Sequence, residues 1–153
     1  MASRSSRWSW NICPERRVSV VAMAGIVTWT DALDAQDDLA ADRRFDPSFG
    51  LIVDLRLVSQ LLLTVAEAKT IVRHSPVALQ APRAFVATTI ATAAIAHACR
   101  AVRTRTTGTD VVLVCGSRLD ALEWVVRRSG ATDEFRRSVQ PGSWRFAKSF
   151  LHN

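Results

Sequence analysis

The chain has 153 residues, of which 48% are hydrophobic and 22% are charged, a balance typical of one globular domain. Its formal net charge is +6, but no dense basic run is present, so the sequence does not predict a DNA or RNA partner. The three cysteines lack a CxxC spacing, which argues against a zinc site or a disulfide framework and indicates reduced thiols in the cytoplasm.

The N-terminal part predicts a β-hairpin after a short disordered start. Residues 1–7 are rich in Ser and Arg, a composition typical of disorder. Apolar residues alternate in Trp8–Ile12, which predicts a half-buried strand, and the longer apolar run Val18–Thr28 predicts its partner. Thr28, Thr30 and Asp31 are candidate caps of a first helix that ends near residue 42.

The middle of the chain predicts a central strand followed by a helix. Leu51–Leu57 is apolar except for Asp54 and Arg56, as expected for a strand covered on both faces. Thr64 and Glu67 have the spacing of a capping box, which predicts a second helix.

The pattern of strand and helix then repeats. It predicts a strand over Arg83–Thr89, an alanine-rich helix over Ala91–Val102, and a strand over Asp110–Cys115. A last helix begins after Ser117 and ends at Arg128. The alternation predicts an α/β domain with one mixed sheet, in which the hairpin is antiparallel and the strands joined by helices are parallel.

The predicted domain spans residues 8–130 and leaves a C-terminal segment over residues 131–153. This segment has no strong period but carries four large apolar residues, namely Trp144, Phe146, Phe150 and Leu151. We expect these side chains to pack back on the domain or on a partner. No apolar segment has the length of a bilayer span, so no membrane span is predicted.

Residues 8–126 resemble the STAS/SpoIIAA-like family, which includes anti-sigma-factor antagonists and bacterial proteins of unassigned function. The resemblance lies in three segments, Gly25–Thr28, Leu51–Leu55 and Ala121–Val125. It implies a SpoIIAA-like sheet with an N-terminal hairpin and helices packed on it. It also implies a non-enzymatic, regulatory protein that binds another protein or a second copy of itself.

The chain departs from that family at the segment Leu61–Thr64. Leu62 and Leu63 stand where the resemblance would place the Asp and the phosphoacceptor Ser of the antagonists. Thr64 falls near a second Ser of that motif, but its place in a capping box explains it as a helix cap. The resemblance therefore implies a partner-binding scaffold without the usual phosphorylation switch.

A small-ligand site is the alternative function, and four residues are its candidates. Asp54 and Arg56 come near the end of the central strand, where open α/β sheets bind ligands. The helix starts at Thr64 and Ser117 could hold an anion there, such as that of a lipid. The plain interpretation is a charge pair at a strand end and two ordinary caps.

An enzyme that uses Cys115 is the third reading. A thiol near a helix start can be a nucleophile if a base is within reach. The candidate bases are His74, His97 and His152, and none has a telling spacing to Cys115. A buried structural thiol is the simpler interpretation, and the sequence predicts no metal and no cofactor.

Overall fold

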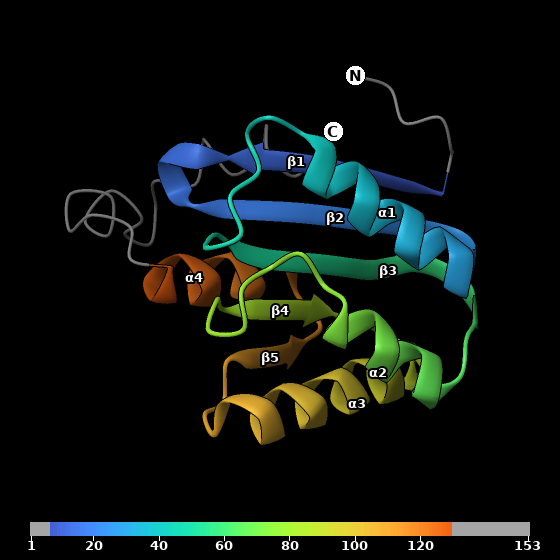
Figure 1. Ribbon diagram of the computed structural model, residues 1–153. Helices are drawn as coiled ribbons and strands as arrows, with labels where there is room; N and C mark the ends of the chain where they lie inside the picture. Colours follow the sequence, from blue (N-terminus) through green and yellow to red (C-terminus); the bar gives the residue numbers. More distant parts are fainter. Residues whose placement is uncertain (1–6, 130–153) are drawn as a thin grey trace.

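The computed structural model describes residues 7–129, which form one five-stranded mixed sheet with helices on both faces (Figure 1). The strands are β1 (Trp8–Cys13), β2 (Val18–Thr28), β3 (Gly50–Leu62), β4 (Arg83–Val86) and β5 (Val112–Cys115). The helices are α1 (Trp29–Ala41), α2 (Val65–Arg73), α3 (Ile90–Thr107) and α4 (Arg118–Arg128), with a 3₁₀ turn, η1 (Pro14–Arg16), between β1 and β2.

The sheet has the strand order β1-β2-β3-β4-β5, so neighbours in sequence are neighbours in space. The β1–β2 pair is antiparallel, because a tight turn joins the two strands. The other three pairs are parallel, because a helix connects each strand to the next. The prediction of a mixed sheet with an N-terminal antiparallel hairpin is confirmed.

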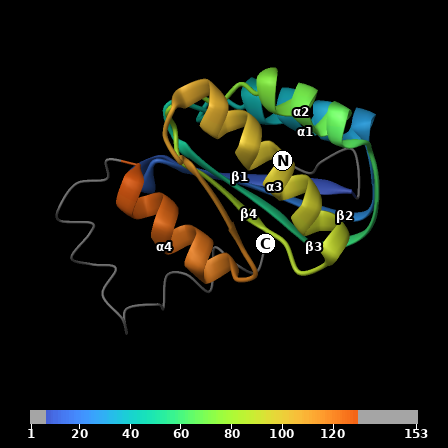
Figure 2. The same ribbon diagram turned by 90° about the horizontal axis from the view of Figure 1, so that it is seen from below.

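The two faces of the sheet are covered unequally (Figure 2). Helices α1, α2 and α3 cover one face and enclose the larger apolar core, to which Leu39, Val72 and Phe85 belong. Helix α4 covers part of the other face, where a smaller core includes Ile52 and Val125. Within residues 7–129, α4 is the one helix on that second face.

Threonine side chains fix three of the four helix starts. The side chains of Thr28, Thr64 and Thr89 each accept a hydrogen bond from the backbone N–H three residues later. The side chain of that third residue in turn accepts a hydrogen bond from the backbone N–H of the cap. Ser117 accepts the corresponding bond from Asp120 N at 3.3 Å. The predicted capping at Thr28, Thr64 and Ser117 is confirmed.

Three element boundaries differ from the sequence-based prediction. Strand β3 runs to Leu62, because its second half continues to pair with β2 after the pairing with β4 has ended at Asp54. Strand β4 ends at Val86 instead of residue 89, because Thr89 is already the cap of the next helix. Helix α3 continues to Thr107, where Gly108 ends it with a φ of 71° that suits glycine.

The predicted C-terminal segment, residues 131–153, and the last residue of the predicted domain, residue 130, lie outside the described residues. Arg7, which the composition assigned to a disordered start, is held in place by hydrogen bonds of its backbone and of its side chain. Its carbonyl accepts from Ala24 N at 2.8 Å, and its guanidinium pairs with Asp31 at 3.0 Å. None of the helices within residues 7–129 combines the length and the apolarity that crossing a bilayer requires.

Candidate functional sites

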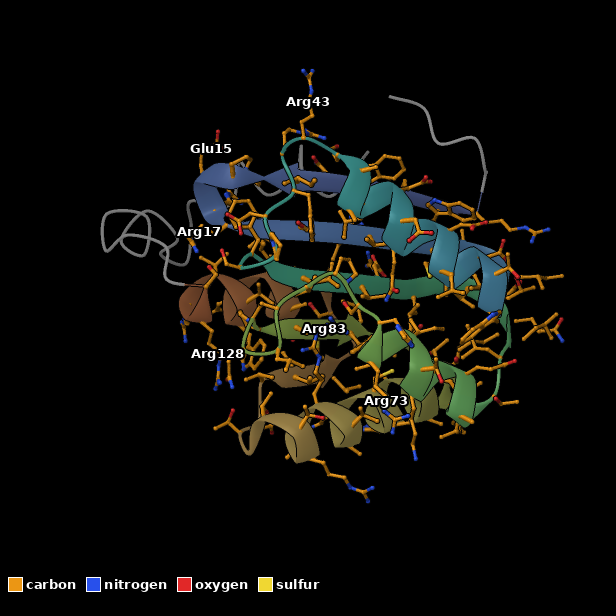
Figure 3. The ribbon with its side chains drawn as sticks, in the orientation of Figure 1. Glu15, Arg17, Arg43, Arg73, Arg83 and Arg128 are labelled. Carbon is orange, nitrogen blue, oxygen red and sulfur yellow. The ribbon has the colours of Figure 1, made fainter. Side chains whose placement is uncertain are left out.

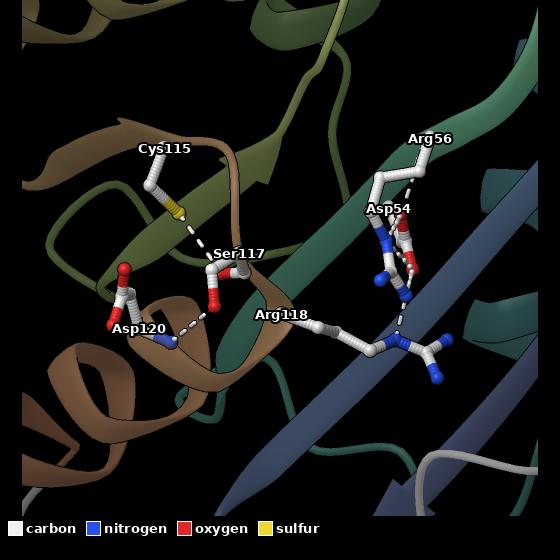
Figure 4. Close-up of polar contacts among 6 residues, drawn as sticks. All are labelled: Asp54, Arg56, Cys115, Ser117, Arg118 and Asp120. Carbon is white, nitrogen blue, oxygen red and sulfur yellow. Dashed lines mark hydrogen bonds and ion pairs between the residues drawn. The ribbon is translucent and has the colours of Figure 1, made fainter.

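Asp54 and Arg56 form a charge cluster under the start of α4 (Figure 4). Arg56 donates from its backbone N and from Nε to Asp54 Oδ1, at 3.1 and 3.0 Å. Its Nη2 donates to Asp54 Oδ2 at 2.9 Å. Strand β3 has a bulge at this point, because Asp54 pairs with Ala22 but Leu57 pairs with Ala24. The bulge brings Arg56 beside the carboxylate of Asp54.

A third residue, Arg118, completes this cluster, and sequence reasoning missed it. Its Nε lies 2.9 Å from Asp54 Oδ2, and both side chains are almost fully buried. Burial alone would raise the pKa of Asp54, but the hydrogen bonds and positive charges of Arg56 and Arg118 lower it below its ordinary value. Asp54 is therefore ionised at neutral pH and ties the first residue of α4 to the central strand.

The structure brings three of the four predicted site residues to one place. Ser117 precedes Arg118 and caps α4, so it lies next to the Asp54 cluster. Thr64 does not, because β3 continues from Leu55 to Leu62 before Thr64 is reached. At the rise of an extended strand, the end of β3 at Leu62 is roughly 25 Å away from Asp54. Thr64 is the cap of α2 and is set apart from the other three residues along β3. A ligand site at Asp54, Arg56, Thr64 and Ser117 stays a prediction.

Cys115 lies on the α4 face, and neither His74 nor His97 lies on that face. His152, the third candidate base, lies outside the described residues. Its sulfur contacts the carbonyl oxygens of Phe85 at 3.8 Å and Ser117 at 3.4 Å. Burial raises the pKa of its thiol, which keeps it protonated at neutral pH. His74 and His97 belong to α2 and α3, which cover the opposite face of the sheet. The geometry gives Cys115 the environment of a structural thiol.

The larger core on the opposite face contains a cavity of about 100 Å³. We call it the Arg83 cavity. Its walls come from the sheet and from α1, α2 and α3, with Ala35, Leu39, Val53, Ala68, Val72 and Phe85 among the apolar residues. Its polar lining residues are Gln36, Ser75, Arg83 and Cys99. Gln36 is already engaged, since its amide donates to the carbonyl of Ile71 at 3.1 Å.

Arg83 is the one charged residue among those that line this cavity. It is the first residue of β4 and is 2% exposed. Figure 3 shows it within the body of the molecule, whereas Arg43 extends outward from the loop after α1. Its Nη2 donates to Ser75 Oγ at 2.6 Å, but its buried Nε has no hydrogen-bond partner among the described residues.

A second buried arginine, Arg103 on α3, lies close enough to repel Arg83. Its guanidinium reaches the carbonyl oxygens of Val77 and Ala78 at 3.4 and 3.3 Å, so it holds the loop before β4. Burial, and to a smaller extent the charge of Arg103, lower the pKa of Arg83 to about 9. Arg83 therefore keeps its charge at neutral pH.

The sequence carries a weak signal for Arg83, which sequence reasoning missed. All four residues of β4 are buried, so an arginine at its start has to be enclosed with the apolar residues that follow. Charged residues are rarely buried unless they are paired. Only the structure, however, reveals that Arg83 is not paired with a carboxylate of residues 7–129.

Metal ligands do not gather anywhere in the described part of the chain, where no group of three His, Cys, Asp or Glu residues could hold an ion.

The tryptophans of the hairpin have structural partners. The indole nitrogens of Trp8 and Trp10 donate to Asp38 and Asp42 at 2.9 and 3.1 Å, which ties β1 to α1. Trp8 and Trp10 also pack against the larger core.

Comparison with known proteins identifies the fold. No family model matches the chain, and no curated protein matches it by sequence. Among solved structures, it is similar to an uncharacterised protein of the DUF3478 family with a SpoIIAA-like fold from Shewanella loihica PV-4. The two share 17% sequence identity over 82% of this chain and 98% of the other, with a TM-score of 0.51. The mixed sheet, the order of its elements and this likeness together establish that the chain has a SpoIIAA-like fold.

Proposed function

We propose that this chain is a non-enzymatic regulatory domain that binds a small molecule in the Arg83 cavity. The observation that carries the proposal is the cavity itself, a partly open space of about 100 Å³ within the larger core. Protein interiors are close-packed, and few of their voids exceed a water molecule. A cavity lined by apolar side chains gives a water molecule few partners, so it favours an apolar group.

The size of the space limits the ligand. An engineered apolar cavity of about 150 Å³ accommodates benzene. The Arg83 cavity, at about 100 Å³, is smaller and suits an apolar group of roughly four carbon atoms. This corresponds to the small-ligand alternative expected from the sequence, but it places the ligand on the face of α1, α2 and α3 instead of beside Asp54.

The proposal is tested by filling the cavity. Ala35 is a buried cavity residue of α1, whereas Ala40 lies on the exposed side of the same helix. Ala35→Leu should occupy the space, and Ala40→Leu is the matched control. Binding of butan-1-ol and of butanoate is followed by NMR chemical-shift titration. We expect at least one probe to bind the wild type and the Ala40→Leu variant but not the Ala35→Leu variant.

Two results would contradict the proposed function. One is that neither probe binds the wild type at millimolar concentration. The other is that the Ala35→Leu variant binds as the wild type does, because the ligand would then lie elsewhere. The melting temperature of both variants is measured as well, since overpacking a site without free space costs about 1–3 kcal/mol.

A second candidate function is the protein-binding role that the family resemblance implies. The observation that favours it is the exposure of large apolar side chains, with Leu57 at 74% and Ile90 at 92%. A second copy of this chain is the partner that can be tested directly, by sedimentation over a range of concentrations. Leu57→Asp should weaken self-association, and Leu79→Asp, at an exposed leucine in another part of the chain, is the control. A chain that stays monomeric throughout would contradict self-association.

A further inference from the structure

The Arg83 cavity has a positive charge at its wall that the described residues do not neutralise. Arg83 and Arg103 are 2% and 1% exposed, and neither takes part in an ion pair with a carboxylate of residues 7–129. Their hydrogen-bond acceptors are a hydroxyl and two carbonyl oxygens, all neutral. A buried charge without a counter-charge is costly, so an anion brought to this place would be strongly favoured.

The thiol beside these arginines does not supply the missing charge. Cys99 lines the cavity, but burial raises the pKa of its thiol to about 11. The thiol is therefore neutral at physiological pH. Cys99 leaves Arg83 and Arg103 as the charged groups of this part of the core.

The hydrogen bonds of Arg83 leave one of its buried donors available to an anion. A guanidinium has five N–H donors in a planar fork that matches a carboxylate. One donor of Arg83 is used by Ser75, while Nε is buried and unpartnered. A carboxylate at the wall of the cavity would accept from Nε and neutralise the charge with the same contact.

The apolar side chains of the cavity wall favour an apolar chain on the ligand, in addition to its anionic group. Apart from Gln36, Ser75, Arg83 and Cys99, the side chains that line the cavity are apolar. An inorganic anion such as phosphate would leave most of its oxygens facing these walls without donors, which is unfavourable. An anionic head group with a short apolar chain satisfies both parts of the site.

We propose that the Arg83 cavity binds a small monocarboxylate, whose carboxylate contacts the Arg83 guanidinium and whose short apolar chain lies among the apolar side chains of the core. This inference rests on the proposed function, because it names the chemical class of the ligand for the same cavity. It adds that Arg83 selects an acid over a neutral molecule of equal size.

The test compares two probes that differ in the head group alone, butanoate and butan-1-ol, on the wild type and on Arg83→Met. Methionine keeps an unbranched side chain and removes the charge. Arg73→Met, at an exposed arginine of α2, is the matched control. Affinities are measured by NMR titration at pH 7, where Arg83 is charged. A charge-assisted hydrogen bond should give butanoate an advantage of about tenfold or more in the wild type and in Arg73→Met. In Arg83→Met the two probes should bind equally, with the affinity for butan-1-ol retained.

The outcomes separate this inference from the proposed function. Equal binding of butanoate and butan-1-ol to the wild type would overturn the monocarboxylate assignment and leave the cavity as a binding site. A preference for butanoate that survives in Arg83→Met would also overturn it, because another group would hold the anion. Failure of both probes to bind would overturn the proposed function. If Arg83→Met does not fold, Arg83→Gln serves instead, since it removes both the charge and Nε, keeps a polar group for Ser75 and should lose the preference for the acid.

Discussion

Both faces of the sheet bury arginine, but only on the α4 face is the buried charge paired with a carboxylate of the described residues. On the α4 face, Arg118 lies 2.9 Å from the carboxylate of Asp54, and Arg56 completes the pairing. On the opposite face, Arg83 and Arg103 meet neutral oxygens only. The first arrangement is complete within the described chain and holds a helix on the sheet. The second leaves a buried donor unused on a residue that lines a cavity, and we propose that this cavity is a binding site.

The comparison predicts that disrupting the Asp54 cluster lowers the free energy of unfolding more than removing the charge of Arg83 does. Asp54→Asn preserves the shape of the side chain but leaves Arg118 buried without its counter-charge. Removing one partner of a buried pair costs about 3–5 kcal/mol. We expect a loss of this order in the free energy of unfolding, measured by urea denaturation. Arg56→Gln is the control, since Arg56 is 40% exposed and its loss should cost about 1 kcal/mol or less. Equal losses in the two variants would contradict this role of Asp54.

The same comparison predicts the opposite sign for Arg83. Replacing a buried charge by an apolar side chain of similar size is often neutral or stabilising, by up to about 4 kcal/mol. Arg83→Met removes a cation without a carboxylate partner, at the loss of one hydrogen bond to Ser75. We expect the ligand-free protein to be as stable as the wild type or about 1–3 kcal/mol more stable. A destabilisation as large as that of Asp54→Asn would show that Arg83 is needed for the fold.

Acid should weaken the α4 face in particular. The pKa of Asp54 is lower in the folded protein than its ordinary value of 3.8, so ionised Asp54 favours the folded state. This stabilisation is fully present above about pH 4 and is lost as the pH falls through the folded pKa. Urea denaturation between pH 6 and pH 3 should show a steeper loss for the wild type than for Asp54→Asn. Parallel curves for the two proteins would mean that other carboxylates account for the acid sensitivity.

The smallest effect is expected at Thr64, which lies outside both arginine sites. Thr64→Ala removes the acceptor for Glu67 N and should cost about 1 kcal/mol, while Thr64→Ser should restore most of it. Ligand binding should be unchanged in both variants.

An anti-sigma-type kinase should leave the Leu61–Thr64 segment unmodified. Stoichiometric phosphate on Thr64, detected by mass spectrometry, would restore the phosphorylation switch that the sequence argues against.

The sequence predicted the fold in most of its detail, because the signals concerned are local. The Thr64–Glu67 capping box, the apolar run from Leu51 and the alternation in Trp8–Ile12 each depend on neighbouring residues. The length of β3 was underestimated, since its second half is stabilised by pairing with β2 and not by its own pattern.

The sites were predicted less well, because they join residues that are distant in the chain. Asp54 and Arg56 are two positions apart and were found together. Arg118 joins them from 64 residues further on, through packing that no local pattern reveals. Arg83 was missed for the same reason, since a charged residue in an apolar run does not show whether a carboxylate faces it in the fold.

The most direct test of the central claim observes the unused donor of Arg83. Buried arginine Nε–H groups give resolved signals in ¹⁵N–¹H NMR spectra, and Arg83→Lys assigns the signal by its loss. Our account predicts that butanoate shifts the Arg83 Nε–H signal in a saturable way, whereas butan-1-ol leaves it nearly unchanged. A signal that does not respond to butanoate, or that responds equally to both probes, would contradict the assignment of Arg83 as the anion-binding residue of this cavity.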